Sequence, residues 1–368
     1  MDLYVFNFSF ERIGIIDNYQ QLEITINYKK HSELDLIVDA TSENIDYFLN
    51  NSDDVILTKA NDTSRGYIID SAKYADASKS TIEVFCKSLG YLLNRRIIDG
   101  QQTYSGTVED ALRYFVDKNA INPSNPNRKI PNLILGNKNG FTTSTTEAFS
   151  NKYLDESLWE TCVKFDLAYD ILMDIANKKF IFTVWQGVDR TTEQTIRDVV
   201  VFAKEFDNVL SQNYVDDKSD YRNVCIIAGE GEGTARTYLI VNDSVTGLDR
   251  HEMFVDARDL QTENEDETTI PQDQYEAMLR ERANSKLAEN ERVRTFETDV
   301  DYNSQFVYGV DYICGDKVTI RNDEIGVVMH TRIVTATEKY TKAGFELNIE
   351  FGSNVPKLLD KIRKVVKN

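Results

Sequence analysis

The sequence has 368 residues, enough for two or three domains, and its 61 acidic against 42 basic side chains give a formal net charge of −19. This balance argues against nucleic-acid binding through a basic surface, because such binding depends on cations that neutralise phosphates. No uninterrupted apolar stretch approaches the about 20 residues of a membrane-spanning helix, and the start Met1-Asp2-Leu3-Tyr4 lacks the basic region of a signal peptide.

Residues 1–98 are predicted to form a small antiparallel β-barrel. Residues 22–28 alternate between apolar and polar side chains, which is the period of a half-buried strand. Thr41 or Ser42 is placed to cap a short helix. Further strands are expected over the runs at 34–38, 55–57, 67–69 and 82–86. Short strands at this spacing are typical of a small barrel or sandwich.

Residues 99–205 are predicted to form an inserted α+β middle domain. Thr107 is placed to cap a helix, with an acidic residue three positions later and an apolar stripe behind it. A second helix is expected to begin at Asp155. The alternating run 167–175, a turn and the returning run 180–185 together predict a β-hairpin.

A glycine-rich run follows the apolar strand predicted at 224–228. In Gly229-Glu230-Gly231-Glu232-Gly233, the glycines make a positive φ easy to adopt. A phosphate site is not expected here, because two glutamates would repel a phosphate and neither phosphate-binding glycine motif is present. The run therefore predicts a hairpin turn with a charged tip, and a strand resumes at 238–241.

The remaining chain is predicted to contain a second barrel interrupted by an insert. The barrel comprises 206–245 and 293–352, and the acidic, helical insert comprises 246–292, with Pro271 in the first turn of its helix. The apolar face of that helix is Tyr275, Met278, Leu279, Ala283 and Leu287. Residues 353–368 are predicted to form a short basic amphipathic helix, which is expected to pack on the body of the protein or on a neighbour rather than on a membrane.

The cysteines give no sign of a disulfide or metal framework. Each lies in or beside an apolar run and far from the others: Cys86, Cys162, Cys225 and Cys314. Buried, reduced thiols are the expectation for such positions, since a zinc site needs cysteines at paired spacing.

Two groups of charged residues contain side chains that occur in functional sites, and neither is assigned a function. Asp249, His251 and Glu252 contain metal-ligating side chains, but neighbours on a strand point to opposite faces. Asp189 and Arg190 have the charges of a catalytic pair, but no nucleophile accompanies them. We expect this pair to hold the loop after the hairpin. No catalytic, cofactor-binding or metal-binding residue is predicted.

Two regions of the chain resemble each other, namely residues 54–85 and 316–351. Each consists of a strand, a longer strand that ends in Lys-Tyr (Lys73-Tyr74 and Lys339-Tyr340), a turn and an alternating strand. Chance similarity between β-rich sequences is the alternative explanation. The predicted fold class is α+β and β-rich, with two related small antiparallel β-barrels, an inserted α+β middle domain and a helical insert.

The strongest sequence signature lies in residues 220–260. Tyr221-Arg222-Asn223-Val224 precedes the glycine run, and the segments Gly247-Leu248-Asp249-Arg250-His251-Glu252 and Val255-Asp256-Ala257-Arg258-Asp259 follow it. This pattern resembles the sequence signature of the tailed-phage tail-tip hub family, and the resemblance to that family extends over nearly the whole chain. That family resembles the hub proteins of contractile-tail baseplates and the N-terminal module of tail-associated lysins.

The resemblance implies a structural protein of the virion rather than an enzyme. In the hub family a trimer with two similar barrels per subunit presents six barrels to the tail tube and three-fold symmetry to the tip. The implied partners are two further copies of the chain, a tail-tube or distal-tail protein ring, the tape-measure protein, and a tip fibre, spike or receptor-binding protein. No cofactor, membrane or specific nucleic-acid sequence is implied. The expected location is the phage tail tip, after synthesis in the host cytoplasm.

Two other functions compete with a hub. A cell-wall hydrolase would need catalytic groups, and the sequence lacks HExxH, GxSxG and a recognisable Cys/His arrangement. A catalytic pair of carboxylates among the 61 acidic residues stays an open alternative. The chain is expected to leave no room for a lysin domain after the second barrel. A glycan- or receptor-binding module could use Tyr19, Trp159 and Trp185, which are more simply explained as core residues.

Overall fold

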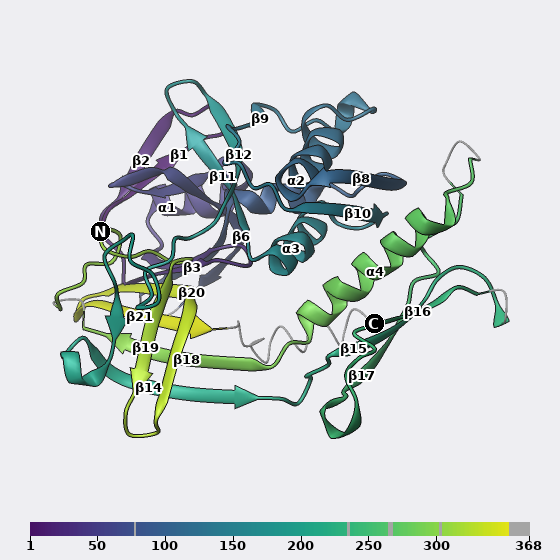
Figure 1. The fold of residues 1–368 in the computed structure, drawn as a ribbon. Coiled ribbons are helices and arrows are strands. Elements are labelled where there is room, and N and C mark those ends of the chain that lie inside the picture. Colours follow the sequence, from purple (N-terminus) through teal and green to yellow (C-terminus); the bar gives the residue numbers. More distant parts are fainter. Residues whose placement is uncertain (77–78, 234–235, 264–267, 302–303, 353–368) are drawn as a thin grey trace. The chain divides into compact units, whose positions relative to one another are not determined.

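The computed structural model describes residues 1–352 except 77–78, 234–235, 264–267 and 302–303. The fold is α+β and rich in antiparallel β-structure, as the sequence predicts (Figure 1). The chain forms two compact units. Unit 1 contains Met1–Gln21, Glu33–Trp185 and Asp220–Glu291, and unit 2 contains Leu22–Ser32, Gln186–Ser219 and the chain from Arg292 onward.

These units divide the chain differently from the boundaries expected from the sequence. Residues 220–245 belong to unit 1 rather than to a second barrel, because their strands pack on the helix of the insert. Residues 22–32 belong to unit 2, although they lie within the expected first barrel. That either unit closes a barrel stays a prediction.

Unit 1 begins with a run of six antiparallel strands in the order β4-β7-β6-β5-β1-β2. Its strands are β1 (Leu3–Phe6), β2 (Arg12–Ile16), β4 (Glu33–Asp39), β5 (Ile56–Lys59), β6 (Asp62–Ala75) and β7 (Thr81–Ser88). The predicted cap is confirmed, since the Thr41 side chain accepts a hydrogen bond from the Asn44 amide at the start of α1 (Ser42–Ile45).

The middle part of unit 1 joins helices to two small sheets. β8 (Gln101–Thr107) pairs with β10 (Ser144–Ser150), and β11 (Ala168–Asp174) forms the predicted hairpin with β12 (Lys179–Trp185), which also pairs with β9 (Leu133–Leu135). Thr107 caps α2 (Val108–Val116) as expected, and α3 (Leu154–Phe165) begins one residue before the predicted start.

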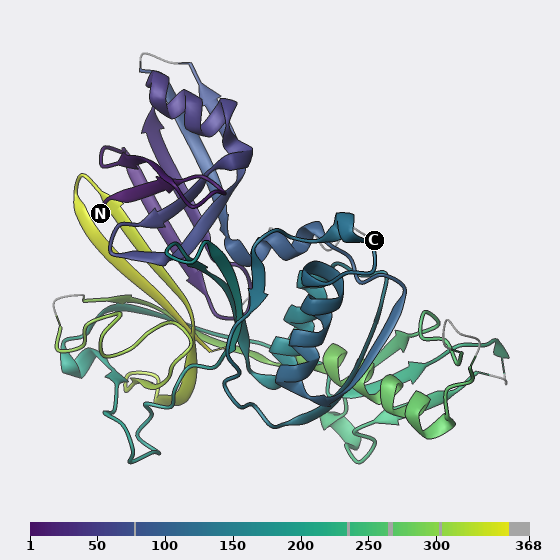
Figure 2. The ribbon, with the colours of Figure 1, turned by 90° about the horizontal axis from the view of Figure 1, so that it is seen from above.

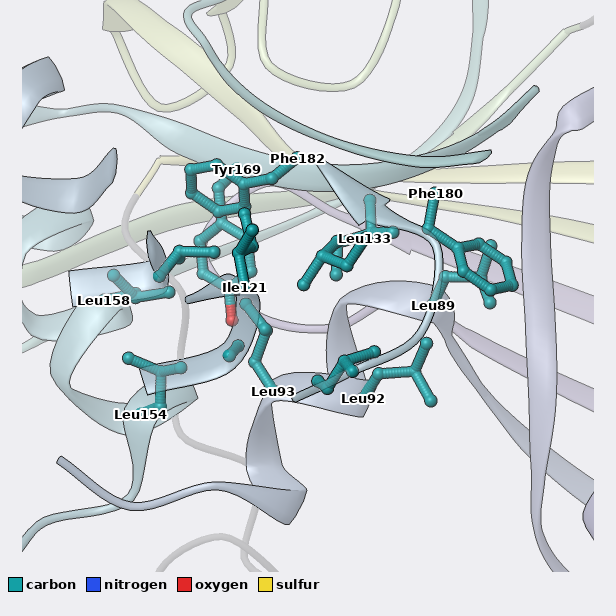
Figure 3. Packing of buried hydrophobic residues seen from close by; sticks show 14 of the residues in the cluster. Leu89, Leu92, Leu93, Ile121, Leu133, Leu154, Leu158, Tyr169, Phe180 and Phe182 are labelled. Carbon is teal, nitrogen blue, oxygen red and sulfur yellow. The ribbon is translucent and has the colours of Figure 1, made fainter. Parts of the chain in front are cut away.

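One hydrophobic cluster fills the centre of unit 1. It is built from a 3₁₀ helix (Leu89–Arg95), α2, α3 and the β9, β11 and β12 strands. Figure 3 shows its members pointing toward one another: Leu89, Leu92, Leu93, Ile121, Leu133, Leu154, Leu158, Tyr169, Phe180 and Phe182. The apolar positions that alternate along β11 and β12 therefore meet the apolar stripes of the helices.

The part of unit 1 between Asp220 and Glu291 has a small core of its own. β15 (Val224–Ala228) lies between β16 (Tyr238–Val241), which is antiparallel to it, and β17 (Glu252–Asp256), which is parallel. The glycine-rich run thus connects an antiparallel pair, as predicted. All five apolar residues expected on α4 (Gln272–Glu289) are buried, and this helix packs on one face of the sheet (Figures 1 and 2). Pro271 is the N-cap residue rather than part of the first turn.

Unit 2 contains the strand order β14-β18-β21-β20-β3. Its strands are β3 (Gln21–Asn27), β14 (Val209–Asp217), β18 (Val293–Val300), β19 (Lys317–Asn322), β20 (Val327–Thr341) and β21 (Gly344–Gly352). β19 pairs with β20 and with the short β13 (Val201–Phe202). The helix expected over 353–368 lies outside the described residues.

Candidate functional site

The same four-strand topology occurs once in each unit. In chain order β4, β5, β6 and β7 give the spatial order β4-β7-β6-β5, and every neighbouring pair is antiparallel. In chain order β18, β19, β20 and β21 give β18-β21-β20-β19, again with antiparallel neighbours only. The two regions that resemble each other in sequence therefore share a topology. Chance similarity between β-rich sequences would not by itself produce the same strand order.

The long strand of each set pairs with the preceding strand through its first part and with the following strand through its last part. β6 pairs with β5 up to Ile68 and with β7 from Tyr67. β20 likewise pairs first with β19, up to Arg332, and then with β21, from Ile333. Each long strand also has a register shift against the following strand, between Ile69 and Ser71 and between Ile333 and Thr335. Such irregularities increase the local twist and bend a sheet.

The Lys-Tyr pairs occupy equivalent places in the two hairpins. Lys73 lies opposite Glu83, and Lys339 lies opposite Glu346. The following tyrosine lies opposite an apolar residue in both cases, and the Tyr340 ring is 4.9 Å from that of Phe345. The repeated dipeptide thus has a repeated structural role at the hairpin end.

The two four-strand sets differ in how their surface charges are balanced. In the first set, ion pairs join Lys73 with Glu83 (3.6 Å), Lys87 with Asp70 (3.6 Å) and Lys79 with Asp39 (2.7 Å). In unit 2, Glu297 on β18 lies directly opposite Glu350 on β21, and like charges at such positions are destabilising. The surface of the second four-strand set therefore carries a local excess of negative charge.

This excess surrounds a groove of about 610 Å³ in unit 2, which we call the acidic groove. Its carboxylates are Glu23, Glu297, Asp299, Glu346 and Glu350. Lys339 is the one basic side chain among the described residues that line it. Asp299 accepts a hydrogen bond from Asn348 at 2.9 Å and another from Ser211. In the described part of the chain, no ion pair involves Glu297, Glu346 or Glu350.

The sequence did not identify the acidic groove. The alternation along β21 was visible, but the cross-strand neighbours of its glutamates depend on the register with β18, about 50 residues earlier. An available signal was the alternation of Glu297 and Asp299 with the buried Phe296, Thr298 and Val300.

Asp189 and Arg190 lie in a loop that is held against the start of β19. The Arg190 Nε atom is 3.1 Å from Asp316 Oδ2, and the Arg190 amide donates to the Lys317 carbonyl at 2.8 Å. Burial would raise the pKa of Asp189, but hydrogen bonds from Thr191 and the charges of Lys317 and Arg332 lower it overall. These contacts are those of a loop anchor.

Asp249, His251 and Glu252 do not converge. Asp249 ends a 3₁₀ turn (Gly247–Asp249), the His251 ring lies 5.2 Å from the Tyr221 ring, and Glu252 accepts a hydrogen bond from Arg250 at 2.6 Å. Within the described ranges, no group of three His, Cys, Asp or Glu side chains is arranged to hold a metal ion.

The four cysteines are buried, reduced thiols, as expected. Burial raises the pKa of Cys225 to about 11 and also raises the pKa of Cys86, so both thiols stay protonated at neutral pH.

Two of the three aromatic residues that could bind a glycan have internal contacts. The Trp159 ring lies 4.4 Å from Tyr169 against the unit 1 core, and the Tyr19 hydroxyl donates to the Met1 carbonyl. None of the helices described is long and apolar enough to cross a membrane.

A family model and solved structures are similar to this chain, the first in sequence and the second in fold. The family described as Siphovirus ReqiPepy6 Gp37-like protein matches residues 2–353. A search of curated proteins finds no match. Among solved structures, the tail protein from Neisseria meningitidis MC58 has a TM-score of 0.56 at 12% identity, with 96% of each chain covered.

Two further tail proteins have the same fold over almost their full length. Prophage tail protein gp18 from Listeria monocytogenes EGD-e has a TM-score of 0.54 at 13% identity, covering 100% of this chain and 99% of its own. The 43 kDa tail protein of prophage MuSo2 from Shewanella oneidensis has a TM-score of 0.56 at 12% identity, covering 95% and 98%.

Proposed function

Because this chain belongs to the Siphovirus ReqiPepy6 Gp37-like family, we propose that it is a structural subunit of a phage tail tip. Three copies form a hub that caps the tail tube around the central channel. The hub matches the six-fold symmetry of the tube on one side and the three-fold symmetry of the tip on the other. The protein is located in the virion and has no enzymatic role.

The observation that carries this proposal is the repeated four-strand topology, β4-β7-β6-β5 and β18-β21-β20-β19. A closed trimer relates its subunits by 120° rotations. With two similar modules in every subunit, six modules alternate around the axis and offer a six-fold ring six similar docking positions. A single module per subunit would offer only three.

The proposed partners follow from that arrangement. The six-module face binds a tail-tube or distal-tail protein ring, and the channel contacts the tape-measure protein. The opposite face binds a tip fibre, spike or receptor-binding protein. Neither a membrane nor a specific nucleic-acid sequence is a proposed partner. Asp189 and Arg190 are proposed as loop anchors, since both are engaged with neighbouring residues.

The test is the molar mass of the purified chain in solution, measured by light scattering with and without tail-tube protein. We expect three times the chain mass of 42.2 kDa, about 127 kDa, or assembly into that trimer when tube protein is added. A chain that stays monomeric and never binds a tube or a tip contradicts the proposal.

A further inference from the structure

Two neighbouring cavities in unit 1 share a pair of arginines. Arg95 and Arg96 line both cavities, and together the two cavities form what we call the arginine cleft. The first cavity, of about 310 Å³, is apolar at its base, because Leu92, Ile130 and Phe180 of the unit 1 core line it. The second, of about 380 Å³, is lined mainly by polar and cationic side chains.

Backbone carbonyls hold the guanidinium groups of the cleft in place. Arg96 donates hydrogen bonds to the carbonyl of Arg95, at 2.8 Å, and to that of Arg128. Arg128 in turn donates to the Ile97 carbonyl and, at 2.8 Å, to the Asp99 carboxylate. These reciprocal bonds fix the orientation of the arginines before any ligand arrives, which reduces the entropy that binding costs.

The second cavity has an excess of positive charge. Arg128 is paired with Asp99, whereas no ion pair in the described part of the chain involves Arg95 or Arg96. None of the described residues that line this cavity is acidic. Burial and the charges of Arg128 and Arg95 lower the pKa of Arg96, and a bound anion would offset both effects. The excess occurs in a chain whose formal net charge is −19.

The surroundings of the arginines are typical of a protein-binding surface. Tyr153 and Ile97, which are 46% and 43% exposed, line the second cavity, and tyrosine and arginine are enriched among residues that contribute most to protein interfaces. Asp53 and Asp54 line the first cavity, so an anion fits only in the second. Neighbouring side chains of one extended segment can therefore occupy the two cavities, an apolar one in the first and a carboxylate in the second.

We propose that the arginine cleft binds an acidic segment of a partner protein, with an apolar side chain of that segment beside Phe180 and a carboxylate on Arg95 and Arg96. Guanidinium groups bind carboxylates through paired hydrogen bonds, which gives the contact its direction. A nucleic acid or a free phosphate would contact the arginines and leave the apolar cavity empty. The cleft lies within unit 1, and its binding does not require the proposed trimer.

Fluorescence anisotropy of the full chain with labelled peptides tests the proposal. The probes are glycine- and serine-flanked peptides in which a phenylalanine precedes or follows an aspartate, directly or across one serine. The best of them should bind at least about tenfold more tightly than its companions with phenylalanine replaced by serine or aspartate by asparagine. No binding by any probe up to about 1 mM, or equal binding without the phenylalanine, overturns the proposal.

Two charge reversals locate the binding. Arg95→Glu changes an exposed side chain of the cleft and should weaken binding of the best peptide about tenfold or more. Arg280→Glu, at a position that is 51% exposed on α4 outside the cleft, should change it less than about twofold. Circular dichroism confirms that both variants are folded. Equal effects of the two variants contradict binding in the cleft, and inorganic phosphate or a labelled oligothymidylate that binds as tightly as the best peptide contradicts a protein partner.

Discussion

Gly187 packs directly against the backbone of Gly315: a Cβ atom placed on Gly187 would lie 1.8 Å from the Gly315 carbonyl oxygen. This contact brings the loop after the β11–β12 hairpin onto the loop that precedes β19. In the same loop, Arg190 reaches Asp316. The loop positions one end of the second repeated module.

Gly187→Ala is expected to destabilise the protein by about 3 kcal/mol or more, because the clash is with backbone that has no room to yield. Urea unfolding measures the loss. Gly106→Ala is the control, since its Cβ would meet only the side chain of Tyr104, which can turn away. Equal losses for the two variants would show that the contact at Gly315 is not tight.

Asp316→Ala should lower the free energy of unfolding by about 3–5 kcal/mol, because it removes a buried carboxylate that binds one cation and two backbone amides. Its side chain is 2% exposed and accepts from Val188 N at 2.8 Å, Arg190 Nε at 3.1 Å and Ile313 N at 3.2 Å. Arg190→Leu should cost less, since Asp316 keeps both amide donors. A double-mutant cycle in urea measures the coupling, and a coupling near zero would contradict the anchor role.

Lys164 connects α3 to two other elements, with its ammonium 2.8 Å from Glu147 on β10 and paired with Glu281 on α4. Lys164→Met leaves Glu147, which is 4% exposed, without its cation, and should cost about 3–5 kcal/mol. Glu147→Gln in the same chain should recover part of this loss. Lys73→Met breaks an exposed pair and should cost under about 1 kcal/mol. Thermal unfolding distinguishes these expectations, and a Lys164→Met loss as small as that of Lys73→Met would contradict them.

Asp256 should make stability depend on pH in the acid range. Hydrogen bonds from Arg258 and Arg236 lower the pKa of Asp256 to about 2, from an ordinary 3.8. A depressed pKa stabilises the folded state above the ordinary value, and this stabilisation disappears as the pH falls through the folded value. Asp256→Asn should therefore melt below the wild type at pH 6, and the two melting temperatures should converge between about pH 4 and pH 2. A constant difference over that range argues against the assigned ion pairs, and Asp198→Asn at an exposed position is the control.

The sequence predicted elements whose signal is local. Thr41 and Thr107 cap helices because a side-chain oxygen and an amide three residues later are enough to form the bond. The β11–β12 hairpin and the buried face of α4 follow from periods of two and 3.6. In each case the residues that decide the structure lie in the same helix or strand or in the next one along the chain.

The features that escaped prediction depend on pairings between distant residues. β15 pairs in parallel with β17, about 28 residues later, and no local pattern encodes that pairing. Glu297 and Glu350 face each other only through the register of β18 with β21. A slip of one residue would move either side chain to the other face of the sheet. The acidic groove therefore becomes visible only in the folded chain.

The measurement that tests the central claim most directly is electron microscopy of the assembled protein on tail tubes, viewed along the tube axis. We expect three subunits whose two repeated modules give six similar densities at one radius, in register with the subunits of the tube. Modules at two clearly different radii, or only three contacts with the tube, would contradict the role of the repeated topology as a symmetry adaptor.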